Sequence, residues 1–274
     1  MKLKLLLFLL LTTFLTHSQE ENKLIFGVNT GVKFAYRQNA IRYTGFYKNQ
    51  LENYFQNPTN YQYVRTQLLN NRDFSFLEYS ELYRYQPAFM FGLMVGYQTS
   101  PNLSFDMDLN FFNLSIVSAY TLEVIDPGNQ TSQEIYQTGF ITGKETRFNG
   151  RINMNYTTDG DKLKYVFGLS GLFNAWRMDE NIAELNGTSL INLYSQHNPS
   201  NGFTLQVNGT NFGYGINVGI QYPISEKINM QILYQPYFNR AEYFNTKTEI
   251  ENMGDAYVKP NLQLEHDLTA RFIW

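Results

Sequence analysis

The final segment of the chain, residues 262–274, alternates between apolar and polar side chains along its whole length. One parity carries Leu262, Leu264, Leu268, Ala270, Phe272 and Trp274. The other parity carries Gln263, Glu265, Asp267, Thr269 and Arg271. Because successive side chains of a strand point to opposite faces, the segment predicts a strand with one apolar and one charged face. A soluble β-sandwich could hold such a strand, but the aromatic end without a polar tail favours an apolar face that contacts lipid.

The first residues predict a secretory signal peptide rather than a membrane anchor. Two lysines precede an apolar run from Leu5 to Leu15, and a small residue follows at Ser18. The run is too short to span a bilayer. We expect residues 1–18 to be removed, so that residues 19–274 form a single domain.

Composition narrows the class of protein further. The chain has no cysteine, which excludes a lipoprotein anchor on cysteine, disulfides and thiolate metal sites. Its mean hydropathy is only -0.36, although 16% of its residues are aromatic. A membrane barrel combines these properties because only every second strand residue faces lipid. The net charge is -3 and no basic face is evident, so we expect no nucleic-acid partner.

Period-two alternation recurs in eight segments, each with a core about as long as a tilted strand needs to cross a bilayer. The segments are 24–36, 87–98, 103–117, 145–157, 163–176, 210–222, 228–239 and 262–274. Short turns at 99–102, 158–162 and 223–227 alternate with long connections at 37–86, 118–144, 177–209 and 240–257. This layout predicts an all-β fold, a closed antiparallel transmembrane β-barrel of eight strands with its long loops outside. A ten-stranded barrel is the alternative, with two strands recruited from residues 61–85.

The inward parity of these strands predicts a charged lumen, and the outward parity predicts an aromatic girdle near the short turns. The expected lumen charge network comprises Lys33, Asp106, Asp108, Arg147, Arg151, Glu265, Asp267 and Arg271. The expected girdle comprises Tyr97, Phe105, Tyr156, Tyr165, Tyr222, Phe272 and Trp274. Because the first and last strands must pair, Lys33 should meet Glu265 or Asp267. We expect the lumen to be closed by salt bridges, since eight strands leave room only for side chains; the alternative is a small porin-like diffusion channel.

The chain resembles the small outer-membrane β-barrel family, the OmpA-like and PorT-like single-domain barrels. The resemblance rests on the signal peptide, the turn from Tyr222 to Lys227 and the strand that ends at Trp274. It implies an integral protein of the Gram-negative cell outer membrane, in contact with its lipids and lipopolysaccharide. It also implies that the barrel-assembly machinery inserts the chain and reads Trp274 as part of an assembly signal. Members of the family serve as adhesins, membrane-integrity proteins or subunits of secretion complexes, so the resemblance does not select one function.

Catalysis is not expected, and neither is a cofactor or a metal. The histidines beyond the signal peptide are His197, in a polar loop, and His266, on the outward parity with no serine at close spacing. Gly213, Gly215 and Gly219 alternate within a strand that no helix follows, so they do not predict a phosphate-binding loop.

The long connection at residues 37–86 is rich in Tyr and Phe among Asn and Gln residues. Aromatic rings with polar tips suit a protein or glycan partner, and we expect one here. The alternative is a loop that packs on itself and caps the barrel. Within it, residues 73–85 predict a short helix with Asp73 as its N-cap.

Overall fold

The computed structural model describes residues 23–43, 51–80, 83–125, 135–193, 208–239 and 263–274. The signal peptide, His197 and the connection at 240–257 lie outside the described residues. The strands are β1 (Lys23–Phe34), β2 (Asp73–Tyr79), β3 (Arg84–Tyr85), β4 (Ala88–Ser100), β5 (Leu103–Ile125), β6 (Ile135–Thr157), β7 (Lys164–Leu185), β8 (Thr188–Asn192), β9 (Asn208–Pro223), β10 (Asn229–Asn239) and β11 (Gln263–Ile273). The helical elements are the 3-10 helix η1 (Arg37–Tyr43), α2 (Leu51–Gln56), α3 (Pro58–Tyr63) and the π-helical turn η2 (Val64–Leu68).

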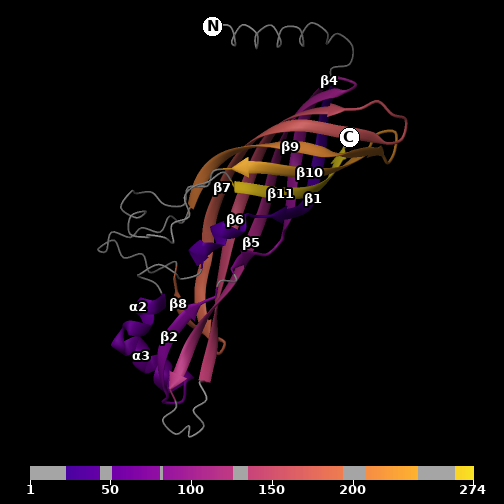
Figure 1. Ribbon diagram of the computed structural model, residues 1–274. Coiled ribbons are helices and arrows are strands. Elements are labelled where there is room, and N and C mark those ends of the chain that lie inside the picture. Colours follow the sequence, from indigo (N-terminus) through magenta and orange to yellow (C-terminus); the bar gives the residue numbers. More distant parts are fainter. Residues whose placement is uncertain (1–22, 44–50, 81–82, 126–134, 194–207, 240–262) are drawn as a thin grey trace, which may run out of the picture.

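Within the described residues, eight antiparallel strands close into a ring in the order β1-β4-β5-β6-β7-β9-β10-β11 (Figure 1). Each predicted segment supplies one of these strands, so the predicted closed eight-stranded barrel is confirmed. Pairing of β1 with β11 closes the ring and sets Lys33 opposite Asp267, in the predicted register. The turns after β4, β6 and β9 are short, as predicted.

Three strands are much longer than predicted. β5 and β6 pair continuously from Leu103 to Val124, and β7 runs to Leu185, so most of the predicted loop at 118–144 and the first part of the predicted loop at 177–209 are strand. The run of apolar outward side chains in β5 ends where the strand passes beyond the apolar outer surface of the barrel, because the next outward residues are Asn113 and Ser115. Alternation continues there, but the apolar residues change to the inward parity, where Leu114, Ile116 and Leu122 are buried.

Beyond the ring, β5, β6 and β7 continue into a sheet that β2 and β8 extend at its two edges. We call this sheet, together with α2, α3 and η2, the external lobe; it lies at the opposite end of the molecule from the short turns (Figure 1). The predicted helix from Asp73 is wrong, because residues 73–79 form β2 with alternating burial. Its Phe74 packs in a lobe core with Phe55 and Tyr120, so tertiary packing overrides the helical spacing. β2 and β3 come from the segment that the ten-stranded alternative required, yet both pair with β5 outside the ring.

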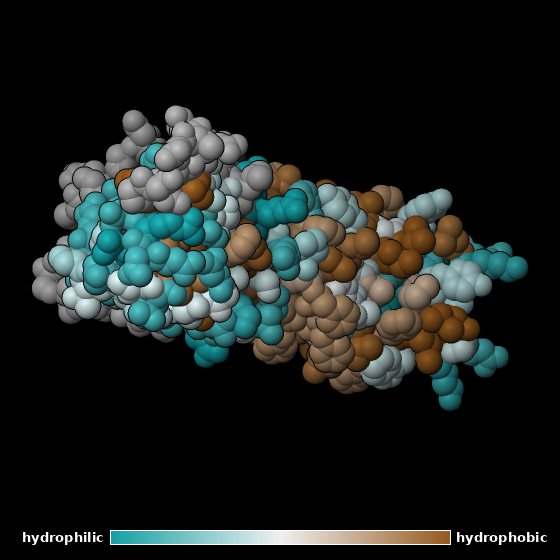
Figure 2. Space-filling model, turned by 90° about the horizontal axis from the view of Figure 1, so that it is seen from below, coloured by the Kyte–Doolittle hydropathy of each residue, from teal (hydrophilic) through white to brown (hydrophobic). Residues whose placement is uncertain are grey.

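The outer surface of the barrel is apolar and its interior is polar, the reverse of a soluble protein. Outward side chains such as Phe89, Ile152 and Phe212 are 69%, 69% and 74% exposed. On the face that Figure 2 shows, apolar side chains gather over the barrel and hydrophilic ones over the lobe and at the opposite tip. We call the apolar zone the belt. Among the described residues, no helix has the length and hydropathy that a membrane span requires.

The position expected for Trp176 requires correction. The sequence places it on the inward parity at the end of a strand, where a side chain is readily solvated. In the structure it lies inside the long β7, opposite Arg147, and is only 3% exposed. The prediction fails because β7 continues nine residues past Trp176, to Leu185.

Candidate functional site

A cluster of ion pairs fills the lumen at the level of Lys33. The Lys33 Nζ lies 2.7 Å from Glu265 Oε2 and 3.2 Å from Asp267 Oδ1, as the register predicted. Arg147 Nη1 lies 3.1 Å from Glu265 Oε1, and Arg151 pairs with Asp267. All five side chains are at most 1% exposed.

Two of these ion pairs bridge the lumen from one wall to the other. Arg147 and Arg151 lie on β6, whereas Glu265 and Asp267 lie on β11. β6 and β11 are four strands apart in either direction around the ring, so they face each other across the lumen. The ion pairs therefore cross the lumen instead of lining it.

An aromatic cap covers this cluster on the side of the external lobe. Glu145, buried on β6, pairs with Arg147 and accepts hydrogen bonds from the hydroxyls of Tyr43 and Tyr85, at 2.7 and 3.1 Å. Tyr43 ends η1 and Tyr85 lies in β3, so the connection at 37–86 inserts side chains into the mouth of the barrel. Tyr43 packs so closely on Gly143 that a Cβ there would lie 2.2 Å from the tyrosine ring.

Tyr237 on β10 completes the central cluster. Its hydroxyl donates to Glu265 Oε2 at 2.6 Å, and its ring centroid lies 3.9 Å from Lys33 Nζ and 4.9 Å from the Arg151 guanidinium. The ring thus stabilises two cations while the hydroxyl helps to hold the carboxylate.

A second cluster lies nearer the short turns, centred on Arg271. Its Nη2 lies 2.6 Å from Asp108 Oδ2, and its Nη1 lies 3.4 Å from Asp106 Oδ1. Two amides share these carboxylates: Asn153 donates to both, at 2.7 and 2.8 Å, and Asn155 donates to Asp106 at 2.6 Å. Each charge of the Arg271 cluster therefore has an ionic partner and further hydrogen bonds, which buried ions require.

Further amide side chains extend the Arg271 cluster toward β9 and β10. Asn217 on β9 donates to Asn153 and Asn155, and Gln235 donates to Asn217 at 3.0 Å. Thr269 lies two residues before Arg271 on the same face of β11, and its hydroxyl donates to Gln235 at 2.9 Å. The Arg271 cluster thus continues through amide and hydroxyl groups of β9, β10 and β11.

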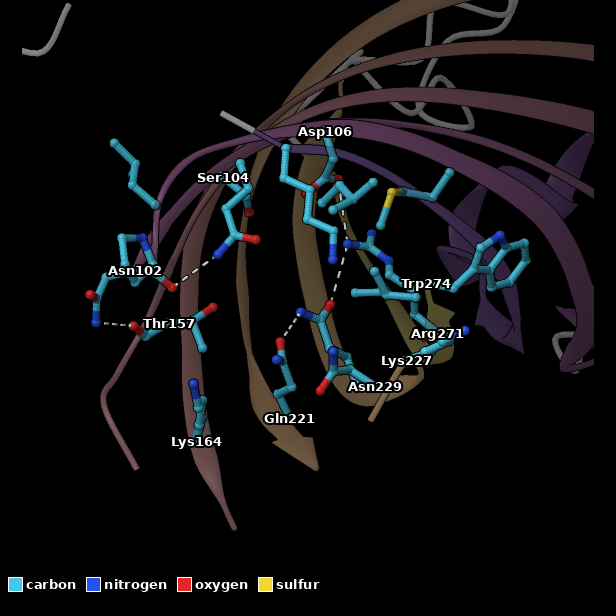
Figure 3. A pocket seen from close by; sticks show the side chains of 18 of the residues that line it. Asn102, Ser104, Asp106, Thr157, Lys164, Gln221, Lys227, Asn229, Arg271 and Trp274 are labelled. Atoms are coloured by element: carbon cyan, nitrogen blue, oxygen red, sulfur yellow. Dashed lines mark hydrogen bonds and ion pairs between the residues drawn. The ribbon is translucent and has the colours of Figure 1, made fainter. Parts of the chain in front are cut away.

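A vestibule of about 210 Å³ opens below the Arg271 cluster, at the end with the short turns (Figure 3). Arg271 and Asp106 form its inner wall, and Lys164 and Lys227 lie among its outer lining residues. Figure 3 shows Arg271 linked to Asp106. Arg271 also donates to Gln231, which in turn donates to Gln221 on β9. The Arg271 cluster therefore closes the inner end of the vestibule.

The structure brings all eight expected lumen residues together in the interior, in these two clusters. Four cations and five anions are buried along the described barrel wall, leaving one net negative charge. The sequence reading missed Glu145, which has the same parity as Arg147 and begins the expected fourth strand. It also missed Tyr43, Tyr85 and Tyr237; the first two come from outside the ring, so alternation gave no signal for them.

The residues expected to form the girdle all lie on the outer face, at the end of the barrel with the short turns. Tyr97 and Phe105 are paired across β4 and β5 and are 40% and 41% exposed. Tyr156, Tyr165, Tyr222 and Trp274 are about half exposed, and Phe272 is partly exposed. Trp274 exchanges two backbone hydrogen bonds with Phe26, which extends the β1–β11 seam to the last residue.

The outward His266 is held by its neighbour Tyr234. The Tyr234 hydroxyl lies 2.8 Å from His266 Nδ1, and the two rings stack with centroids 5.8 Å apart. The inward Gly213, Gly215 and Gly219 lie against β10, where a Cβ would meet backbone oxygens at 2.1 to 2.6 Å. These glycines therefore permit close strand packing. Among the described residues, no group of three or more His, Asp or Glu side chains is arranged to hold a metal ion.

In the lobe, Tyr120 lies behind the cap and donates to the carbonyl oxygen of Glu184 at 3.0 Å. Burial raises the pKa of Tyr120 and that of Tyr79 above the usual value for a phenol. Both side chains thus remain neutral hydrogen-bonding groups at physiological pH.

Comparisons with known proteins show a likeness at the level of structure alone. No family model matches the sequence, and no curated protein matches it. The crystal structure of Neisserial surface protein A aligns with 93% of this chain and 98% of its own, at 11% identity and a TM-score of 0.41. A likeness this distant identifies neither a family nor a function.

Proposed function

We propose that this chain is an integral outer-membrane protein of a Gram-negative bacterium, that its barrel neither conducts nor catalyses, and that its external lobe binds a partner. One observation carries the proposal: a closed ring of strands with an apolar outer belt surrounds a lumen crossed by buried ion pairs. Within a bilayer, a β-sheet must close on itself to satisfy its backbone groups, as this sheet does.

The outward side chains support membrane insertion. An exposed belt of aromatic and aliphatic side chains around a whole barrel greatly exceeds the apolar patch of a soluble monomer. Aromatic residues at one end of the belt, including Tyr97 and Trp274, fit the headgroup layer of a membrane. We propose that Trp274 also forms part of the signal that the barrel-assembly machinery reads.

The interior supports a closed barrel. Opening a path would require breaking the Arg147–Glu265 and Arg151–Asp267 pairs and displacing Tyr43 and Tyr85 from the mouth. Separating buried charges costs several kcal/mol for each pair. The barrel is therefore expected to act as an anchor for the lobe.

Planar-bilayer recording on the purified, refolded protein tests the closed lumen. We expect no discrete channel events, while a shift in gel mobility on heating confirms that the barrel is folded. Stable, uniform conductance steps from the folded protein would overturn the proposal in favour of a diffusion channel.

The lobe is the proposed partner-binding region because it presents aromatic and aliphatic side chains outside the belt. Tyr63, Leu77, Tyr136 and Phe140 are 43% to 52% exposed there. Their rings and polar neighbours suit a protein or a glycan. A Leu77→Ser/Phe140→Ser variant should bind glycan arrays and cell-surface fractions less than the wild-type protein does. A belt variant, Ile152→Val, should bind them as the wild type does. Equal binding by both variants would place the partner site elsewhere.

A further inference from the structure

The vestibule at the end of the barrel with the short turns has a cationic rim. Three lysines line its outer part: Lys23, Lys164 and Lys227. None of the three makes an ion pair within the described part of the chain. Of the two acidic side chains in the lining, Asp106 is bound to Arg271, which leaves Glu226. A carboxylate at the end of the chain, on Trp274, would still leave the lysines in excess.

Two of these lysines lie on opposite walls of the lumen. Lys23 begins β1 and Lys164 begins β7, and these strands are four places apart in either direction around the ring. Both lysines have the inward parity, because the next residues, Leu24 and Tyr165, point outward and are 55% and 53% exposed. The two ammonium groups are therefore available to a ligand that enters along the barrel axis, and not to the lipid around the belt.

Amide side chains line the walls between the lysines. Gln98 lies opposite Lys23 in the β1–β4 register, and Gln221 lies opposite Lys164 in the β7–β9 register. The side-chain oxygen of Gln221 accepts a hydrogen bond from Gln231, but within the described residues its NH2 group donates none.

The side chain of Asn229 also makes no hydrogen bond within the described ranges. Figure 3 shows Lys164, Gln221 and Asn229 among the side chains around the vestibule. An amide both donates and accepts hydrogen bonds, so these side chains match the groups of a peptide bond.

The vestibule is a dead end, because Arg271 and Asp106 are bound to each other at its inner wall. Its volume is about 210 Å³. Sites that enclose a whole small molecule have volumes of about 300–1,000 Å³. A smaller, closed site with a cationic rim suits the anionic end of a longer chain.

We propose that the vestibule binds the carboxylate end of a peptide chain. A carboxylate between Lys23 and Lys164 would accept charge-assisted hydrogen bonds from both, and the peptide groups behind it would meet Gln221 and Asn229. Stem peptides of the cell wall and the C-termini of proteins share this chemistry. The inference goes beyond the proposed function, since it assigns a ligand to the barrel and not to the lobe. It rests on the proposed membrane insertion only in placing this mouth in the periplasm.

The test uses the full mature chain, refolded into lipid nanodiscs, and titration calorimetry with acetyl-tetra-alanine, which has a free carboxylate. The C-terminal amide of the same peptide should bind at least about tenfold more weakly, the loss expected when charge-assisted hydrogen bonds are removed. Lys23→Gln/Lys164→Gln should weaken binding of the free carboxylate to the same extent, whereas Lys23→Arg/Lys164→Arg should retain binding.

The matched control is Lys144→Gln/Lys162→Gln, which removes the same charge from two residues that do not line the vestibule. Lys162 is the closer match, because it lies two residues before Lys164 in the neighbouring short turn. This control should bind the peptide as the wild type does. A control that loses as much affinity as Lys23→Gln/Lys164→Gln would refute the assignment to the vestibule.

Further arms separate the sources of the carboxylate and the reasons for failure. Tighter binding of a muropeptide with free stem-peptide carboxylates than of acetyl-tetra-alanine assigns the ligand to the cell wall, and the reverse order assigns it to a protein C-terminus. Inorganic phosphate should compete only weakly, and full competition would overturn the assignment to a peptide.

Heat-dependent gel mobility reports folding and insertion independently of peptide binding. A wild-type protein that does not insert refutes the proposed function. An inserted protein that binds the peptide and its amide equally, or binds equally with and without the two lysines, refutes this inference alone.

Discussion

Replacing Glu265 by glutamine is expected to destabilise the barrel far more than replacing a carboxylate on the surface. Glu265 is fully buried and lies 2.7 Å from Lys33 Nζ, 3.1 Å from Arg147 Nη1 and 2.6 Å from the Tyr237 hydroxyl. Glutamine keeps the shape but removes the charge, so both cations lose a buried partner. Breaking a buried ion pair costs about 3–5 kcal/mol.

The lower end of that range applies here, since each cation keeps a second carboxylate: Lys33 keeps Asp267 and Arg147 keeps Glu145. We expect Glu265→Gln to lower the free energy of unfolding by about 3 kcal/mol. Glu180→Gln is the matched control, because Glu180 lies 2.8 Å from Lys144 with both side chains over 40% exposed. An exposed pair contributes less than about 1 kcal/mol.

Urea unfolding in detergent micelles, followed by tryptophan fluorescence, provides the comparison. The two tryptophans, Trp176 and Trp274, report on the interior and the belt respectively. A Lys33→Met/Glu265→Gln double variant removes one charge of each sign, and its loss of stability should be smaller than the sum of the two single losses. Equal urea midpoints for Glu265→Gln and Glu180→Gln, or strict additivity in the double variant, would refute the electrostatic account of the lumen.

Three further predictions concern packing, pH and topology. Gly168→Ala should lower the urea midpoint clearly, whereas Gly171→Ala should not. A Cβ at Gly168 would lie 2.7 Å from a carbonyl oxygen of β6, but a Cβ at Gly171 would meet nothing within 4 Å. Similar midpoints for the two variants would contradict this packing. Burial raises the pKa of Tyr120 in the folded protein. Its contribution to the free energy of unfolding is therefore complete below its pKa in the unfolded chain, about 10, and is lost as pH rises through its pKa in the folded protein. Near-ultraviolet circular dichroism should therefore show the packing of the lobe loosening above about pH 10, while the barrel keeps its heat-dependent gel mobility. A spectrum that does not change at alkaline pH would contradict this role of Tyr120. Protease added to intact cells should cut within residues 37–86 and leave the turn at Glu226 intact, whereas cleavage at Glu226 would reverse the orientation.

The sequence by itself determined the barrel strands, their facing and the register at the seam. These follow from local rules: alternation assigns each side chain to one face, and short turns fix which strands are neighbours. Even the contact between Lys33 and Glu265 could be predicted, because the first and last strands of a closed ring must pair.

Only the tertiary structure decided which charges meet across the lumen. Whether Arg151 pairs with Asp267 or with a neighbour depends on how the strands are staggered around the closed ring, which no single segment encodes. The cap has the same origin: Tyr43 and Tyr85 enter the mouth because Glu145 and Gly143 receive them there. The lengths of β5, β6 and β7 were hidden as well. Beyond the belt the apolar residues of β5, such as Leu114 and Leu122, lie on the inward parity, and burial beneath the lobe replaces contact with lipid as the reason for the fold.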